Sequence, residues 1–120
     1  MYKIKFYRDK KGKCPFEIFL NELLPKEQAK FIKFMDVLEE YGPNLKRPYA
    51  DILRSDIREL RVKFGNNQYR ALYFFIHRNH IIMTHGILKN TDKVPPEEID
   101  RAIRYKNDFE QRLNKEDLLG

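Results

Sequence analysis

Three strand-like runs follow one another in the middle of the chain, and their spacing constrains the fold more than any other feature. Residues 58–64 alternate between apolar and charged side chains, residues 69–76 are almost continuously apolar, and residues 81–88 form a third run. Alternation is typical of a strand with one buried face, and a continuous apolar run is typical of a central strand. Because short, turn-like segments at 65–68 and 77–80 separate the runs, the sequence predicts an antiparallel meander.

Helices and one further strand are predicted around this meander. Residues 2–7 alternate as in a strand, residues 16–23 carry apolar side chains at helical spacing, and residues 26–41 form a longer apolar stripe that Gly42 and Pro43 end. Residues 44–56 read as a polar connection, and the prolines and acids at 95–98 indicate the start of a last helix. The order strand, helix, helix, three strands, helix predicts one α+β domain over residues 1–120.

The charge balance favours a polyanionic partner. Lys and Arg number 24 against 18 Asp and Glu, which gives a net charge of +6, and such an excess promotes binding to phosphates. The single cysteine, Cys14, cannot form an internal disulfide. The first residues lack the apolar run of a signal peptide, and no stretch approaches the length of a membrane span. We therefore expect a cytoplasmic protein with no membrane partner.

No pattern in the sequence indicates a metal or a cofactor. The histidines at 77, 80 and 85 lack metal-ligand spacing, and there is no glycine-rich phosphate loop, nucleophile elbow or dinucleotide fingerprint. We therefore expect neither a metal site nor a cofactor.

Cations on the predicted meander are the candidates for chemistry. Arg61 and Lys63 share one face of their strand, Arg70 interrupts an apolar run, and Lys89 and Lys93 flank the loop after the last strand. A cationic sheet suits RNA binding and metal-free cleavage, in which a 2′-hydroxyl attacks the neighbouring phosphate and cations stabilise the transition-state charge. These positions are equally compatible with solvated surface charges, so the residues alone leave both interpretations open.

Several segments resemble the RelE/ParE superfamily of toxins. Residues 57–64 (IRELRVKF) and 68–76 (QYRALYFFI) resemble its central RELR…YRxLYFF motif. Residues 85–95 (HGILKNTDKVP) resemble the HGFxKKTxKTP segment of the phage-derived Gp49-like branch, which includes HigB toxins, and residues 98–102 match its EIxxA helix. The resemblance covers residues 57 to about 103 and implies a RelE-like fold, a twisted antiparallel sheet with helices packed on one face.

The resemblance also implies a function. It implies the toxin of a type II toxin–antitoxin system, a ribosome-dependent mRNA endoribonuclease (an mRNA interferase) that inhibits translation. The implied partners are the ribosome, mRNA and a HigA-like antitoxin with a helix-turn-helix, through which operator DNA is reached indirectly. Two alternatives stay open, namely a ParE-type inhibitor of DNA gyrase and a non-catalytic module that binds an antitoxin.

Site residues are carried over position by position. Arg61 matches the arginine of ELR and Arg70 that of YR, while Lys89, Thr91 and Lys93 match the KKTxK loop. Asn90 replaces the second lysine of that loop and Val94 its threonine, which removes one cation. The resemblance thus implies Arg70 and Lys89 for transition-state charge, Arg61 for substrate phosphates, and His85 or Glu59 as proton acceptor. The residues expected to bind RNA are Arg58, Lys63, Thr91 and Lys93.

Overall fold

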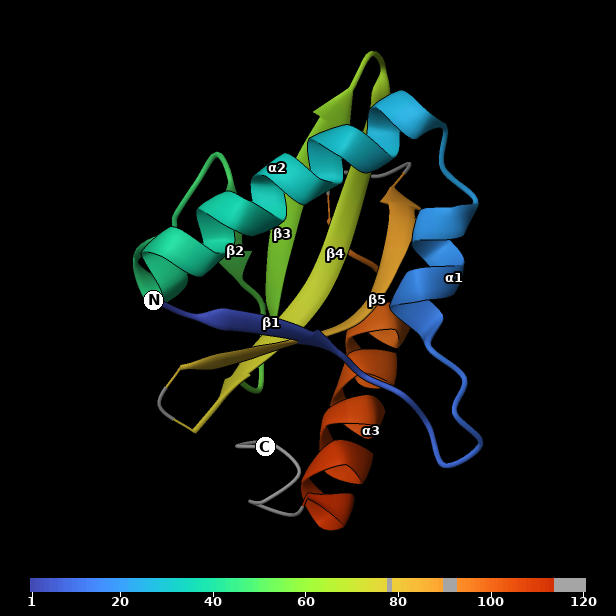
Figure 1. Cartoon of the computed structure of the whole chain (residues 1–120), viewed down its shortest axis with the longest axis vertical. Helices are drawn as coiled ribbons and strands as arrows, with labels where there is room; N and C mark the ends of the chain where they lie inside the picture. Colours follow the sequence, from blue (N-terminus) through green and yellow to red (C-terminus); the bar gives the residue numbers. More distant parts are fainter. Residues whose placement is uncertain (78, 90–92, 114–120) are drawn as a thin grey trace.

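Five strands form one mixed sheet, with helices against it (Figure 1). The structure is a computed structural model that describes residues 1–77, 79–89 and 93–113. Along the chain the elements are β1 (Lys3–Phe6), α1 (Pro15–Asn21), α2 (Pro25–Tyr41), a 3-10 turn (Gly42–Asn44), β2 (Ala50–Ile52), β3 (Arg58–Phe64), β4 (Asn67–Ile76), β5 (His80–Lys89) and α3 (Pro96–Arg112). The α+β class is confirmed, and the predicted order holds apart from β2.

The predicted meander is confirmed. β3 pairs antiparallel with β4, and β4 pairs antiparallel with β5. The turn between β3 and β4 is tighter than the sequence suggested, because Phe64 lies opposite Asn67 and only two residues remain between them. Gly65 begins this turn with φ +60°, a left-handed conformation that glycine adopts without steric cost.

The prediction of a wholly antiparallel sheet is wrong. β1 pairs parallel with β5, with Lys3 opposite His80 and Phe6 opposite Met83, so the sheet order is β1-β5-β4-β3-β2. Alternation in residues 2–7 predicts a half-buried strand in either direction, and therefore could not fix its orientation. β2 was missed because three residues are too few to establish a period; they pair with β3.

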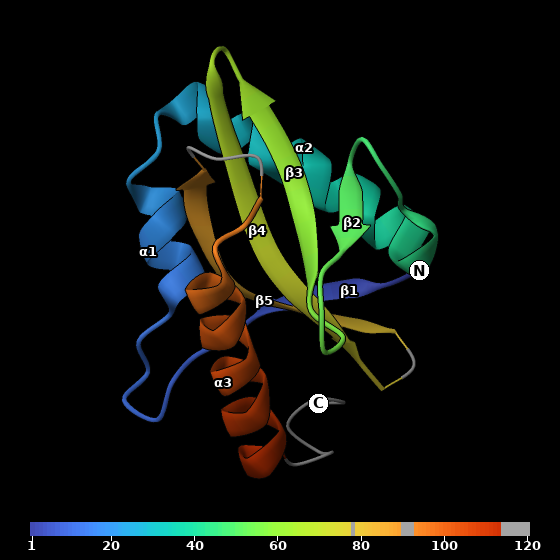
Figure 2. The ribbon, with the colours of Figure 1, turned by 180° about the vertical axis from the view of Figure 1, so that it is seen from behind.

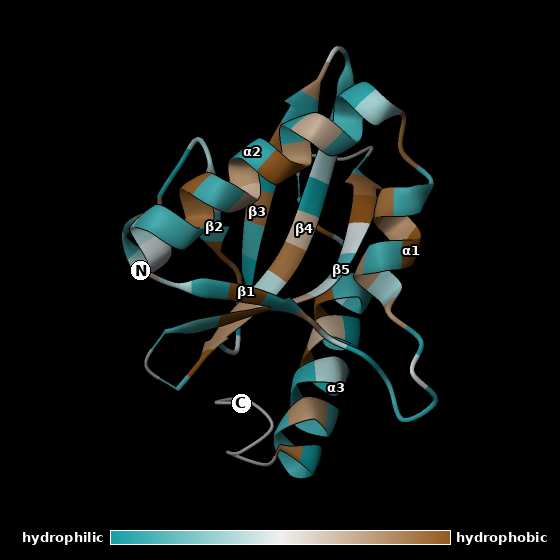
Figure 3. Ribbon diagram, in the orientation of Figure 1, coloured by the Kyte–Doolittle hydropathy of each residue, from teal (hydrophilic) through white to brown (hydrophobic). Residues whose placement is uncertain are grey.

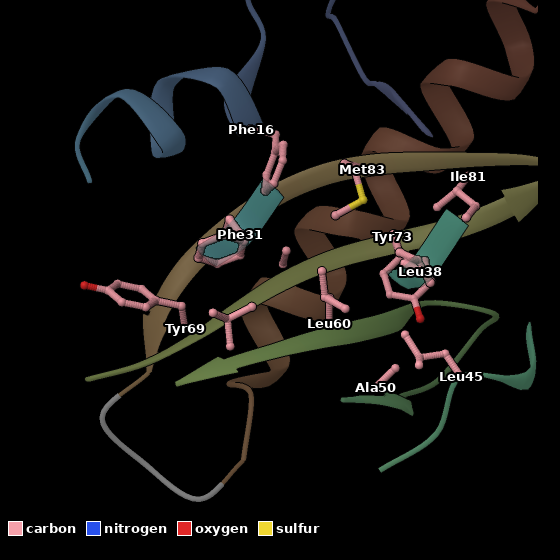
Figure 4. Close-up of a cluster of buried hydrophobic side chains, with 12 residues drawn as sticks. Phe16, Phe31, Leu38, Leu45, Ala50, Leu60, Tyr69, Tyr73, Ile81 and Met83 are labelled. Carbon is pink, nitrogen blue, oxygen red and sulfur yellow. The ribbon is translucent and has the colours of Figure 1, made fainter. Parts of the chain in front are cut away.

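α1 and α2 pack on one face of the sheet, as expected. Figure 4 shows Phe16 of α1 and Phe31 of α2 against the strand residues, including Leu60, Tyr73 and Met83. All five side chains are fully buried. Burial of a large apolar side chain contributes about 1.5–3 kcal/mol, so this layer contributes substantially to the stability of the sheet.

α3 packs against the opposite face, so the helices expected on one face cover two. Its buried residues Ile99 and Ala102 join a second cluster with Leu72, Phe74 and Ile82, which alternate with the residues of the first cluster. Seen from that side, α3 covers the second half of β4, which holds Leu72 and Phe74, whereas no described helix crosses this face at the start of β4, where only α2 lies behind the sheet (Figure 2).

The hydropathy of β4 changes along the strand, and the change follows the boundary between the part that α3 covers and the part that it does not. Figure 3 shows hydrophilic residues at the start of β4 and hydrophobic residues further along. The apolar part is the part on which α3 packs. Among the residues that the structure describes, no helix has the length and apolar character that a membrane crossing needs.

Candidate functional site

Strand register gathers the predicted site residues on the face of the sheet that α3 partly covers. Arg61 of β3 lies opposite Arg70 of β4. Three successive rows, read from β3 across β4 to β5, are Glu59–Leu72–His85, Arg61–Arg70–Ile87 and Lys63–Gln68–Lys89. Alternate residues of a strand share a face, so four predicted cations lie side by side. We call Arg61, Lys63, Arg70 and Lys89 the cationic face.

A β-bulge sets which residues of β5 take part. The register shifts between Leu72 and Tyr73, because Leu72 lies opposite His85 whereas Tyr73 lies opposite Met83. Thr84 is therefore the extra residue, as expected of a bulge. Beyond it the odd-numbered residues of β5, His85 and Lys89 among them, lie on the same face as Arg70.

Glu59 joins the two arginines of the cationic face. Its Oε2 accepts a hydrogen bond from Nη1 of Arg61 at 3.0 Å, and its Oε1 lies 3.0 Å from Nε of Arg70 in an ion pair. The Glu59 and Arg70 side chains are only 5% and 2% exposed, whereas that of Arg61 is 21% exposed. A buried guanidinium requires an anionic or hydrogen-bonding partner, and Glu59 supplies the anion.

Further contacts hold Arg70 in place. Nη1 donates to the carbonyl of Tyr69 at 3.0 Å, and Nη2 donates to Oε1 of Gln68 at 3.1 Å. Burial lowers the pKa of Arg70 from its ordinary value, and the positive charge of Arg61 acts in the same direction, while Glu59 opposes both. The carboxylate therefore holds two like charges together on neighbouring strands.

The remaining predicted cations differ in position. Lys63 is exposed at the end of β3, Lys89 is buried at the end of β5, and Lys93 is exposed just before α3. Thr91 lies outside the described residues. Arg58 belongs to the other face of β3, where its guanidinium lies 5.0 Å from the ring centre of Phe75. The structure therefore separates Arg58 from the cationic face.

His85 is buried at the border between the cationic face and α3. Thr84 Oγ1 donates to the carbonyl of Leu72 at 3.1 Å and so accepts from Nδ1–H of His85, also at 3.1 Å. Nε2 lies 3.4 Å from Oε1 of Glu98. Burial first, and then the positive charges of Arg101 and Arg104, lower the pKa of His85 to about 3. At neutral pH the imidazole is therefore uncharged, and its low pKa makes it a weak proton acceptor in the RNA-free protein.

The lowered pKa of His85 predicts acid sensitivity. The unfolded chain binds a proton near pH 6.5, whereas the folded chain binds it only near pH 3, so this group favours unfolding increasingly as pH falls below 6.5. We expect it to lower the free energy of unfolding by about 1 kcal/mol between pH 7 and pH 5.5. Urea titrations at both pH values measure the difference. His85→Asn should reduce the pH dependence, and a slope equal to that of the wild type in this variant would contradict the assignment.

Sequence reasoning did not identify every residue of this site. Gln68 and Glu98 contact Arg70 and His85, respectively, yet neither was predicted as a site residue. Gln68 could have been found from the alternation of β4, because it shares a face with Arg70. Glu98 could not, because its position depends on how α3 packs against the sheet.

A family model for phage-derived Gp49-like proteins matches residues 18–107. The chain belongs to the Gp49-like family. Every residue of the cationic face, together with Glu59, His85 and Glu98, lies within the matched segment. The family is associated with the toxins of toxin–antitoxin systems and is related to RelE-type toxins. A comparison with curated proteins finds no match.

Most of the charged side chains in the site of this Gp49-like protein are cations. Among the described residues, no group of three or more His, Cys, Asp or Glu side chains could hold a metal ion. The site holds two guanidinium groups that share the carboxylate of Glu59. Two lysines lie in the next row of the sheet, and a neutral imidazole lies in the row of Glu59. Such a site can bind phosphate oxygens and stabilise negative charge that develops on them.

Proposed function

We propose that this Gp49-like protein is a HigB-like toxin of a type II toxin–antitoxin system and cleaves mRNA on the ribosome without a metal ion. Its proposed partners are the ribosome, mRNA and a HigA-like antitoxin that neutralises it, and its proposed location is the cytoplasm. The family association supports a toxin and an antitoxin partner. The chemistry of the cationic face supports RNA as the substrate.

The observation that carries the proposal is the pairing of Arg61 and Arg70 around Glu59. Two guanidinium groups share a single carboxylate, so positive charge remains for a second anion. Planar guanidinium groups match the geometry of phosphate oxygens. Arg61 and Lys63 are accessible enough to meet RNA first, whereas Arg70 and Lys89, on the neighbouring strands, are buried.

The proposed reaction uses the 2′-hydroxyl of the RNA itself. The 2′-oxygen forms a bond to the adjacent phosphorus while the bond from phosphorus to the 5′-oxygen breaks, which leaves a cyclic phosphate and a 5′-hydroxyl. Arg61 holds the phosphate, and Arg70 and Lys89 stabilise the charge on the phosphorane-like transition state. The proton of the 2′-hydroxyl passes to a base, and the 5′-oxygen takes up a proton as it leaves.

His85 is favoured over Glu59 as the base. Each oxygen of Glu59 faces a guanidinium group, so a proton there would disturb the pairing that holds the arginines. His85 is uncharged and its Nε2 forms no hydrogen bond with the described residues, and a phosphate brought beside it by RNA would raise its low pKa. A 2′-hydroxyl would have to enter the space beside Nε2, next to Glu98.

Cleavage mapping in a reconstituted translation system tests the proposal. The purified protein should cut mRNA within the codon in the ribosomal A site, and only when ribosomes are present, as read by primer extension. Arg61→Gln/Lys63→Gln should lower the cleavage rate about 10- to 100-fold at limiting protein concentration, because two side chains that hold RNA phosphates are lost. Lys26→Gln/Lys33→Gln removes the same charge from exposed positions of α2 and should cleave normally.

Two outcomes would contradict the proposal. If folded wild-type protein makes no cuts with or without ribosomes, inhibition of gyrase or simple binding of an antitoxin becomes the better explanation. If both double variants lose activity equally, overall charge and not the cationic face determines cleavage.

A further inference from the structure

Two adjoining hollows lie at the β2 edge of the sheet and border the cationic face, since the backbone N–H of Arg61 donates to the carbonyl of Tyr49 at 2.7 Å. The larger, of about 400 Å³, lies between the end of α2 and the segment that leads to β2. Its lining includes the apolar side chains of Val37 and Leu45 and the aromatic rings of Tyr41 and Tyr49. The smaller hollow, of about 290 Å³, shares Leu45 with it.

The tyrosine rings of the larger hollow are accessible for stacking. Tyr41 is 51% exposed and Tyr49 is 47% exposed. Phe34 contacts Tyr49 edge-on, with the ring centres 5.9 Å apart, so one ring is held by the core while much of its surface stays open. Open aromatic faces beside cations are the stacking platforms on which single-stranded nucleic acids bind.

The charges around the hollows complement phosphate. Lys46 and Arg47 line both hollows, and the part of the chain that the structure describes contributes no carboxylate to the larger one. The smaller hollow adds Arg58 and Asp51. Nε of Arg47 pairs with Asp51 at 2.8 Å, yet the arginine side chain remains 66% exposed, so its outer nitrogens can meet a second anion.

We propose that the two hollows form a second RNA-binding surface, which holds single-stranded RNA. Bases stack on Tyr41 and Tyr49, while Lys46 and Arg47 bind the phosphates between them. The tyrosines favour RNA over an acidic protein segment, because RNA bases stack on aromatic rings whereas carboxylates do not. Because Arg47 is close enough to Arg70 to contribute to lowering its pKa, this surface continues from the cationic face around the edge of the sheet. If the proposed function holds, RNA bound here extends toward the site at which it is cleaved.

Fluorescence anisotropy with a labelled 2′-O-methyl oligonucleotide tests this surface. The probe lacks a free 2′-hydroxyl and cannot be cleaved, so the result does not depend on the proposed nuclease activity. The assay uses the Arg61→Gln/Lys63→Gln protein, in which the cationic face is weakened. Adding Lys46→Gln/Arg47→Gln should weaken binding at least tenfold and reduce the salt dependence by about 1.4 in log–log slope, which corresponds to two lost phosphate contacts.

Tyr41→Ala and a charge control complete the experiment. Tyr41→Ala should weaken binding about tenfold with little change in the salt slope, because it removes stacking and no charge. Lys26→Gln/Lys33→Gln should bind as the parent does. The proposal is overturned if this control weakens binding as much as Lys46→Gln/Arg47→Gln, or if Tyr41→Ala has no effect. Equal competition by a polyglutamate of the same length would also overturn it, in favour of an acidic protein partner.

Discussion

Replacing Glu59 by leucine is expected to lower the free energy of unfolding by about 3–5 kcal/mol. The change removes the carboxylate that lies 3.0 Å from both Arg61 and Arg70. Arg70, whose side chain is 2% exposed, would keep a buried positive charge beside a second one with no carboxylate between them. Urea denaturation followed by circular dichroism measures the loss, which is a large part of the total stability of a domain of this size.

Two control variants separate the ion pair from a general loss of charge. Glu59→Leu/Arg70→Met removes both charges and keeps similar side-chain volumes, so it should recover most of the lost stability. Asp51→Asn breaks an exposed pair with Arg47 and should cost no more than about 1 kcal/mol. A loss for Glu59→Leu as small as that for Asp51→Asn would show that Arg70 does not depend on the carboxylate.

Local patterns predicted the elements, whereas pairing between distant segments could not be predicted. The three runs of the meander each carry a strand pattern and are joined by short turns, so both their existence and their antiparallel order follow from the sequence. The partner of β1 is β5, more than seventy residues away. Nothing in residues 2–7 specifies that partner, and the parallel pairing was therefore found only in the structure.

Turn length decided which cations meet. The sequence correctly placed Arg61 and Lys63 on one face, because the period of a strand is two residues. A four-residue turn at 65–68 would have put Leu72 opposite Arg61. The two-residue turn instead puts Arg70 opposite Arg61. A turn that is two residues shorter leaves each side chain on the same face but changes its neighbour on the next strand. The sequence therefore did not predict that Arg61 and Arg70 share the carboxylate of Glu59.

The bulge at Thr84 had a larger effect on the site. An uninterrupted β5 would have turned His85 toward α1 and α2, because each one-residue shift moves a side chain to the opposite face. With the bulge, His85 lies on the face of Arg70 and meets Glu98 of α3. The same alternation explains why Arg58 does not join the cationic face. It lies three positions before Arg61, an odd number, so its side chain points to the opposite face.

Removing the charge of Arg70 is expected to abolish most cleavage in a protein that still folds. Glu59→Leu/Arg70→Met should lower the rate of A-site cleavage about 100- to 1000-fold, because a group that stabilises transition-state charge is lost. Arg70→Lys should fall between this variant and the wild type, since it keeps the charge but loses the planar fork that donates to Tyr69 and Gln68. Single-turnover cleavage of ribosome-bound mRNA measures these rates.

Glu59→Leu, assayed at a temperature at which circular dichroism shows it folded, separates the two residues. It lacks the carboxylate but keeps Arg70, so most of its cleavage should remain if His85 is the base and Arg70 carries the transition-state charge. If the double variant cleaves as fast as Glu59→Leu, Arg70 has no role in catalysis and serves only to pair with the buried carboxylate of Glu59. Loss of activity in Glu59→Leu equal to that of the double variant would instead make Glu59 the proton acceptor, with the guanidinium groups of Arg61 and Arg70 serving to orient it.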